Sequence, residues 1–526
     1  MRFCSPGIIK IRLVPADNLV RREFRRTRLF VGTGIFKRIS TLIMHKLMIE
    51  RVKSRWACES GYRNILVLAF PLILSTSAWS VQHFVDRMFL TWYSPETIAA
   101  AMPAGILNFA LMTVFIGTAG YVSTFIAQYF GANQHDRIGP VLWQGIYISV
   151  IAGVGFLALI PYSGSLFRFI GHDPIIQRYE TIYFRVLCYG AVPAIASSAL
   201  SGFFSGLGKT WPIMWVNVLA TVVNLVLDYT MIFGKWGFAE RGIQGAAIAT
   251  VIATYVSCGV FMLLLSRRAF DEQYHTRRGW RLDLGLLRRI WKFGFPNGVQ
   301  FFLDMIGFTA FLLFMGRLGT VSLAATNIAF NINSLAFMPM LGFGIAVSVL
   351  VAQHLGENKP ELAERSVYSG FHITFLYMGS IALCYFFLPK LFLWPYSLQS
   401  DAAAFEPIRQ LTTVLLRFVA VYSLFDALTI IFASAVKGAG DTRFAMYAIL
   451  LISGAVFTLP SYLALIVLKQ NVYVGWVIAS TYAIVMGLTF FFRFLQGKWK
   501  TMRVIEEVPP FIPPLLSENP VVEYEI

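Results

Sequence analysis

Four aspartates fall inside stretches of the chain that are otherwise almost free of charge. Asp86, Asp228, Asp304 and Asp426 each lie in an apolar segment long enough to cross a membrane. A carboxylate at the centre of a bilayer costs about 3 kcal/mol on insertion scales, so intramembrane acids commonly bind ions, carry protons or contact substrate. The alternative is that each carboxyl group is protonated and neutral, or is paired with another group inside the bundle, and serves only packing. We expect the four aspartates, as a group, to be functional.

Two of these aspartates are expected at one depth, together with an amide and a hydroxyl. Asp86 and Asp228 lie seven and six residues before the outer ends of their segments, and Thr250 lies eight residues after the start of its own. At 1.5 Å per residue, all three are about 10 Å from the outer end. Asn224 lies one turn before Asp228 on the same helix face. These oxygens can hold a small cation. The carboxylates can equally carry a proton, because burial and a second carboxylate both disfavour the charged form. Na⁺ and H⁺ both remain open.

Asp304 and Asp426 are expected near the middle of two later segments, where they can form a second acidic site lining a cavity. An anionic pocket with nearby aromatic and methionine side chains suits flat organic cations. Such apolar neighbours more often face lipid or the core, so we assign no role to any one of them.

The chain repeats itself in the same direction. Three pairs of residues lie 225 positions apart: Pro71 with Pro296, Gln128 with Gln353, and Gly131 with Gly356. Farther along, "SGLGKT" from Ser205 is repeated as "KGAGDT" from Lys437, 232 positions later. Parallel repeats in an apolar chain are typical of transporters whose halves are related by an axis along the membrane normal. The fold class expected is therefore an all-α integral membrane protein with two homologous six-helix bundles and a pseudo-twofold axis along that normal.

Composition places the repeats in a membrane: 57% of the 526 residues are hydrophobic, 13% are charged, and the mean hydropathy is +0.65. Twelve spans of about 20 residues or more are predicted, at 64–93, 98–130, 140–161, 178–204, 211–234, 243–266, 288–317, 322–352, 366–389, 411–436, 443–468 and 472–495. We expect an N-terminal extension over 1–60, an N-half over 61–266, a basic linker over 267–287, a C-half over 288–497 and a tail over 498–526.

The net charge of +17 is concentrated outside the spans. Residues 1–60 hold fourteen Lys and Arg against four Asp and Glu, and further basic clusters lie in the linker and after the last span. The positive-inside rule makes these segments cytoplasmic, with anionic lipid headgroups as their partner. No aromatic–basic module accompanies the charge, so nucleic acid is not expected. We expect a monomer in the plasma (inner) membrane with both termini cytoplasmic, and Met44 or Met48 as the true start.

Other classes of site find no support. The five cysteines and seven histidines are scattered without ligand spacing, so no metal site is expected apart from a possible Na⁺ site. "GFFSGLGKT" from Gly202 has five residues between its glycines where a phosphate-binding loop needs four, and it follows a membrane segment rather than a strand. No nucleophile or metal constellation accompanies the aspartates, so we expect no enzyme and no catalytic residue.

The ordered motifs resemble those of the MATE family, the multidrug and toxic compound extrusion transporters, including its NorM- and DinF-like members. The resemblance covers roughly 62–500. It is carried by "FVDRMF", "AQYFGAN", "NLVLDYTMIFG", "GIQGAAIAT" and "GAGDT" at their order and spacing.

The resemblance implies that Asp86, Asn224, Asp228 and Thr250 form the cation-binding site of the N-half, and that Pro71 is a hinge. It places Asp304 and Asp426 at the acidic site of the C-half, with Asp304 standing where NorM-type members usually carry Glu. It implies export of organic cations by antiport with Na⁺ or H⁺, without a cofactor. A flippase or exporter of lipid-linked or endogenous metabolites on the same fold is the alternative. A passive channel fits the two repeated acidic halves less well.

Overall fold

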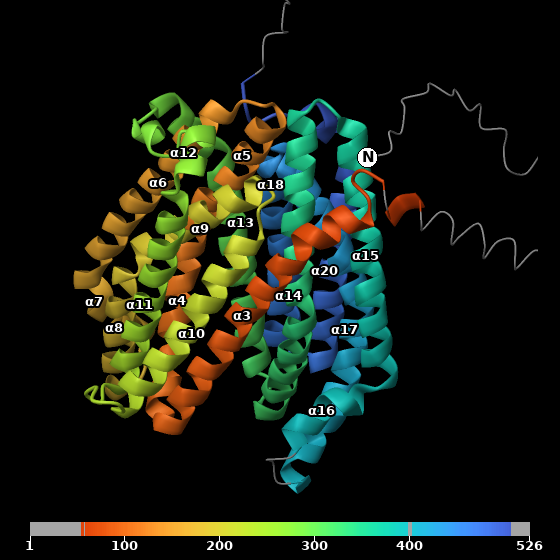
Figure 1. Ribbon diagram of the computed structural model, residues 1–526. Coiled ribbons are helices and arrows are strands. Elements are labelled where there is room, and N and C mark those ends of the chain that lie inside the picture. Colours follow the sequence, from red (N-terminus) through yellow and green to blue (C-terminus); the bar gives the residue numbers. More distant parts are fainter. Residues whose placement is uncertain (1–53, 57, 398–401, 507–526) are drawn as a thin grey trace, which may run out of the picture. The chain divides into compact units, whose positions relative to one another are not determined.

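The computed structural model describes residues 54–56, 58–397 and 402–506, and divides into two compact units, Met1–Cys58 and Glu59–Ile526. The fold of the second unit follows (Figure 1). The expected N-terminal extension, with Met44 and Met48, lies almost wholly outside the described residues, as does the tail beyond Glu506.

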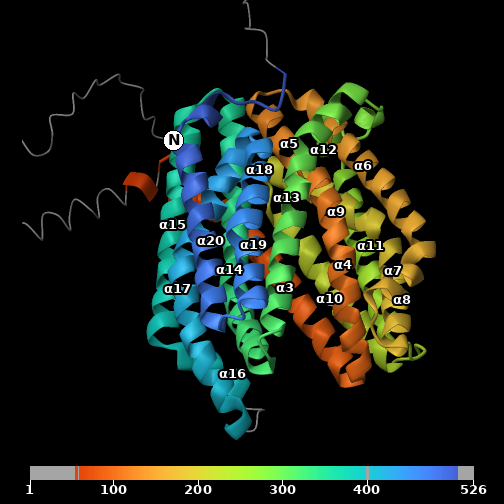
Figure 2. The same ribbon diagram turned by 180° about the vertical axis from the view of Figure 1, so that it is seen from behind.

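The second unit is helical, and no strand occurs among its described residues. The N-half contains α3 (Tyr62–Tyr93), α4 (Pro95–Gly120), α5 (Val122–Gly131), α6 (Ile138–Leu159), α7 (Ser163–Ile170), α8 (Pro174–Tyr189), α9 (Ala191–Gly206), α10 (Trp211–Phe233) and α11 (Gly242–Leu265). After α12 (Arg268–Tyr274), the C-half contains α13 (Leu284–Gly316), α14 (Thr320–Gly356), α15 (Pro360–Phe387), α16 (Pro389–Ser397), α17 (Ala402–Ala439), α18 (Thr442–Ile452), α19 (Leu459–Tyr462) and α20 (Val472–Leu495). The two halves gather on opposite sides (Figures 1 and 2).

The prediction of twelve membrane spans is confirmed. In the described part of the chain, eleven helical segments are long and apolar enough to cross a membrane, and the bent pair α8 and α9 makes a twelfth. The bend of 47° falls at Gly190. Pro193 follows closely and has no backbone N–H to offer the preceding turn, which explains the break.

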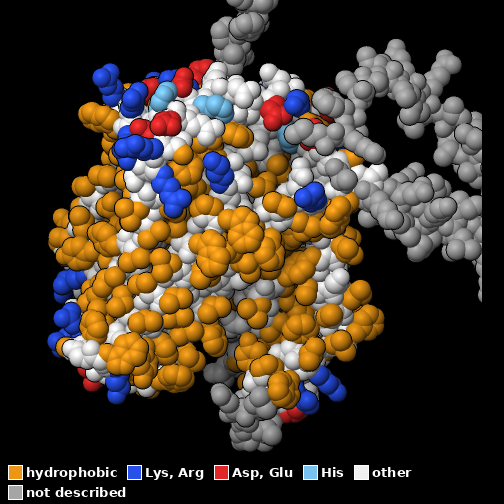
Figure 3. All heavy atoms as spheres, in the orientation of Figure 1, with side chains coloured by type: hydrophobic (Ala, Val, Ile, Leu, Met, Phe, Trp, Pro, Cys, Tyr) orange, Lys and Arg blue, Asp and Glu red, His pale blue; other side chains and the backbone are white. Residues whose placement is uncertain are grey.

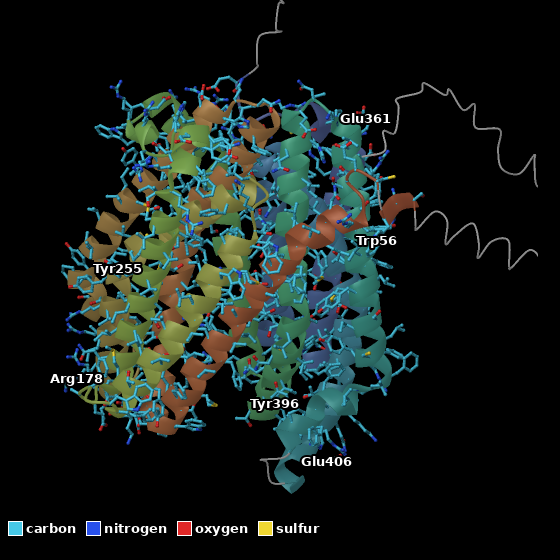
Figure 4. All side chains as sticks on the ribbon, in the orientation of Figure 1. Trp56, Arg178, Tyr255, Glu361, Tyr396 and Glu406 are labelled. Carbon is cyan, nitrogen blue, oxygen red and sulfur yellow. The ribbon has the colours of Figure 1, made fainter. Side chains whose placement is uncertain are left out.

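The two ends of the bundle differ in how the halves meet. We call the end that carries α12 the linker end and the opposite end the α16 end; Glu361 marks the first and Glu406 the second in Figure 4. At the linker end, one hydrophobic core joins both halves, including Ile65 and Val351. Towards the α16 end the core divides into one cluster around Trp476 of the C-half and another around Ile232 of the N-half. The halves are therefore packed together at the linker end and apart at the α16 end.

Glycines permit the close approach at the linker end. A Cβ atom added to Gly131 would overlap the backbone carbonyl of Gln353, and one added to Gly356 would overlap that of Gln128. Small residues let membrane helices approach backbone to backbone. Hydrogen bonds between α3 and α14 reach only as far as Thr76, whose hydroxyl donates to the carbonyl of Met338 at 3.2 Å; among the described residues, none is found between these helices nearer the α16 end.

The chain after α20 lies across the linker end and contacts both halves. Trp499 is buried and stacks on Phe494 at 4.9 Å between ring centroids. The backbone N–H of Val504 donates to Oε1 of Gln128 at 2.8 Å. The Glu506 carboxylate accepts a hydrogen bond of 2.6 Å from the Tyr129 hydroxyl and forms an ion pair with Arg289. This segment therefore connects the N-half to the C-half.

The surface agrees with membrane embedding. Hydrophobic side chains cover the belt between the two ends, while charged side chains gather mainly at the linker end, with a few at the α16 end (Figure 3). An apolar belt bounded by charge is what a bilayer requires of a spanning protein.

Candidate cation site

The first candidate site lies between α3 and α10. Asp86 and Asp228 lie within hydrogen-bonding reach of each other, although 142 residues separate them in the chain. Asp228 is fully buried, while Asp86 is only partly so. Asn224, one turn earlier on α10, is also fully buried and within reach of the Asp228 carboxyl group. The structure thus brings together three of the four residues predicted for this site.

The polar atoms of this site are not satisfied. Within the described part of the chain, Oδ1 of Asp86, both carboxyl oxygens of Asp228 and both side-chain polar atoms of Asn224 have no hydrogen-bond partner of good geometry. Two ionised carboxylates can only accept, so neither can supply the other with a donor. A proton shared between them, or a small cation coordinated by both, would satisfy these oxygens. The site can therefore hold a monovalent cation between its two acids.

Thr250 stands apart from the three. Its hydroxyl donates to the carbonyl of Ala246 at 3.0 Å, one turn earlier on α11. A threonine hydroxyl in a membrane helix commonly bonds to its own backbone in this way. The side chain remains half-buried on a helix that packs against α10, so the role predicted for Thr250 stays a prediction.

Two further side chains, Tyr183 and Arg87, interact with the acid pair. Tyr183 of α8 lies close enough to both aspartates to interact electrostatically, and nothing in its own segment signals this position. Arg87 interacts electrostatically with Asp86 and with Tyr183. Adjacent residues of a helix point in different directions, but the long arginine side chain carries its charge far from the backbone.

The second candidate site lies in the C-half. Asp304 of α13 and Asp426 of α17 both lie near enough to Tyr482 of α20 to interact with it electrostatically. For the two described aspartates, no interaction with each other is found like that of the first pair. Asp304 lies within hydrogen-bonding reach of Gln300 and near the ammonium of Lys437. The sequence did not predict a cation at this site, because Lys437 lies two residues from the end of α17 and only its long side chain reaches inwards.

Pro71 lies inside α3, fifteen residues before Asp86, and α3 continues through it as one helix. The proline is buried. Close by, Ile73 packs against Gly342 of α14, where an added Cβ atom would lie 2.7 Å from the isoleucine side chain. The predicted hinge therefore lies in the part of α3 that contacts the C-half.

Twelve spans in two repeated halves, with carboxylates buried between helices, define an all-helical membrane protein of the two-repeat transporter class. Within that class, the chain belongs to the MatE family, whose model matches residues 71–230 and 296–463. The matched segments begin at Pro71 and Pro296, the two prolines related by the repeat.

Individual proteins similar to this chain in sequence or in fold extend the comparison. A probable multidrug resistance protein NorM of Brucella suis is 26% identical over 396 residues, covering 75% of this chain and 83% of the relative. Its counterpart in Thermotoga maritima is 24% identical over 455 residues, covering 84% and 94%. A multidrug resistance MATE family transporter solved in an outward-facing conformation aligns with a TM-score of 0.76 at 19% identity, covering 84% of this chain and 97% of that one. This last likeness shows a shared fold.

Proposed function

We propose that this protein exports amphipathic organic cations by antiport with Na⁺ or H⁺. The observation that carries the proposal is the pair Asp86 and Asp228: among the described residues, both carboxyl oxygens of the buried Asp228 and Oδ1 of the partly buried Asp86 lack a hydrogen-bond partner. The names of the relatives, multidrug resistance proteins, support an organic-cation substrate. The acids of the C-half, Asp304 and Asp426, provide the negative charge that such a substrate would meet.

The proposed mechanism is alternating access. The joined core at the linker end and the divided core at the α16 end favour one state, in which the space between the halves faces the α16 end. Opening the linker end and closing the other would give the second state. Export follows if the cation and the organic substrate prefer opposite states, because such coupling is reciprocal between the two ligands. We propose that bending at Pro71 contributes to the change.

The proposed orientation follows from charge. We propose that the linker end is cytoplasmic, because its basic side chains obey the positive-inside rule and can contact anionic headgroups. The state described above is then outward-facing, in a plasma (inner) membrane protein that acts as a monomer with both termini cytoplasmic.

The test is ethidium transport by the purified protein in liposomes, with a Na⁺ gradient and a pH gradient imposed separately. We expect one gradient to drive transport, and Asp86→Asn and Asp228→Asn each to lower the driven rate at least tenfold. Asp136→Asn is the matched control, because Asp136 is an exposed aspartate at the linker end. Driven transport retained by both site variants would refute the assignment. Ethidium that stays in place under both gradients would favour a lipid-linked or endogenous metabolite as substrate.

A further inference from the structure

Lys437 is a basic residue placed at the acidic site of the C-half. Its Nζ atom lies 5.3 Å from the centre of the Phe301 ring, a cation–π distance. Phe301 lies three residues before Asp304 on α13, so the two side chains share one face of that helix. The ammonium also interacts electrostatically with the Asp304 carboxylate. In this state of the protein, the C-half site therefore already contains a cation, and that cation is tethered to the chain.

The backbone of the same residue belongs to the closed contact between the halves. The Tyr121 hydroxyl of the N-half donates to the carbonyl of Lys437 at 2.6 Å. The next carbonyl, that of Gly438, accepts from Nε2 of Gln128 at 3.4 Å. Lys437 thus joins two regions: its side chain reaches the acidic site, and its main chain is held by the opposite half at the linker end.

The repeat shows that this arrangement is confined to one half. The position equivalent to Lys437 in the N-half is Ser205, 232 residues earlier. Ser205 is buried, and its hydroxyl donates to the carbonyl of Gly202 at 3.2 Å in its own helix. Packing alone is therefore satisfied by a small side chain at this position. The lysine adds a charge that the fold does not require.

We propose that Lys437 is a positioning residue for coupling: its ammonium acts as a tethered counter-ion of Asp304 while the linker end is closed, and a mobile cation at Asp304 displaces it. Because the carbonyl of Lys437 is the acceptor for Tyr121, movement of the lysine is transmitted to the contact that keeps the linker end closed. The inference rests on the proposed function, since it names how one acidic site would be linked to opening.

The lysine would also set the charge of the site. The ammonium of Lys437 offsets the charge of Asp304, the acid of this site with which it interacts. Tyr482 of α20 interacts electrostatically with both acids and is a further titratable neighbour of Asp304. Without Lys437 the Asp304 carboxylate would lose this counter-ion and attract a mobile cation more strongly.

The test measures cation binding through the melting temperature of the purified protein, so that it needs no transport. A cation that binds only the folded state stabilises it. Melting temperatures of the wild type, Lys437→Met, Asp304→Asn and the double variant are recorded as NaCl replaces choline chloride at constant ionic strength, and separately as the pH is lowered. We expect Lys437→Met to gain at least about 2 °C more stabilisation from Na⁺ or acid than the wild type does, and Asp304→Asn to abolish this gain in the double variant.

Two further variants separate charge from packing. Lys437→Arg keeps the charge and should retain the wild-type cation dependence, whereas Lys437→Gln should behave like Lys437→Met and replaces it if the methionine variant does not fold. Lys209→Met is the matched control, because Lys209 is an exposed lysine held over the Phe270 ring at 4.8 Å, four residues after the equivalent of Lys437.

The proposal is overturned if the variants that lack the ammonium respond to cations as the wild type does. It is equally overturned if the extra stabilisation by Na⁺ or acid in the Lys437 variants persists when Asp304 is also replaced by asparagine. Failure of the proposed function would look different: wild-type protein would not move ethidium under either gradient, while the melting-temperature cycle would still report whether Lys437 and Asp304 compete with a mobile cation.

Discussion

Gln128 and Gln353 make the same hydrogen bond in opposite directions across the boundary between the halves. Nε2 of Gln128 donates to the carbonyl of Gly438 at 3.4 Å, and Nε2 of Gln353 donates to the carbonyl of Gly206 at 2.8 Å. The glutamines are 225 residues apart and the glycines 232, which are the two offsets of the internal repeat. The pseudo-twofold relationship is therefore part of the contact that closes the linker end.

Replacing both glutamines by leucine should weaken this closed state. Each substitution removes a hydrogen bond worth about 1 kcal/mol and leaves a buried glycine carbonyl without its donor. Gln128→Leu also removes the hydrogen bond that Oε1 of Gln128 accepts from the Val504 N–H. We expect a larger population with the linker end open. Spin labels at Asp136 and Glu361, one in each half, would report it as a longer distance in a cysteine-free background. An unchanged distance distribution in the double variant would contradict this role.

Alanine at Gly131 or Gly356 should have a stronger effect than loss of the glutamines. The added methyl group would overlap a carbonyl oxygen of the opposite half, and backbone cannot move aside as a flexible side chain can. We expect either variant to be trapped with the linker end open and to lose at least about 90% of transport, because steric overlap in a packed interior is not relieved by small adjustments.

The control for that experiment is Gly155→Ala, since nothing lies within 4 Å of a Cβ atom built at Gly155. Normal transport by Gly131→Ala together with a closed linker end, measured with the same spin labels, would show that the close approach is not required.

Asp228→Asn should make the protein more stable while abolishing coupled transport. The substitution removes one of two adjacent carboxylates from a buried position, and the new amide can donate to Asp86. We expect the melting temperature at pH 8 to rise by about 2 °C, the lower end of what about 1 kcal/mol produces in a domain of roughly 150–250 residues. Asp136→Asn should leave it unchanged. A lower melting temperature for Asp228→Asn would mean that the carboxylate is satisfied in a way the structure does not reveal.

Glu506→Gln tests the segment that joins the halves after α20. Burial alone would raise the pKa of the Glu506 carboxyl, but the hydrogen bond from Tyr129 and the charges of Arg289 and Arg137 more than offset it and lower that pKa. A lowered pKa in the folded state means that the carboxylate contributes stability at neutral pH. This contribution is lost as the pH falls below the ordinary glutamate value of about 4.3 and through the lowered one.

We therefore expect Glu506→Gln to melt at a lower temperature than the wild type at pH 7, with the difference shrinking below about pH 4. The difference should be small, because the Glu506 side chain is 47% exposed and solvent screens its ion pairs. Glu361→Gln is the control, because Glu361 is an exposed acid at the same end without a described ion pair. A difference that grows at low pH would refute the assigned sign.

The sequence by itself determined the class of the molecule. The length of each apolar stretch predicts a membrane-spanning helix, because a bilayer requires about 20 residues per helix whatever the helix packs against. The repeat around Pro71 and Pro296 gave the two halves, and the distances of Asp86 and Asp228 from their helix ends placed both acids at one depth. Each of these follows from local composition and from the fixed rise of a helix, so no knowledge of the packing was needed.

Only the tertiary structure decided which side chains meet. Depth does not specify how a helix is rotated about its axis, so Thr250 could be placed at the right level without its hydroxyl joining the site. Tyr183 reaches the acid pair from a helix that the sequence does not associate with it. Lys437 lies on the helix of Asp426, but its side chain reaches Asp304 on another helix. The closed linker end depends on glycines that pack against the opposite half. These are long-range contacts, set by how helices pack against each other rather than by any one segment.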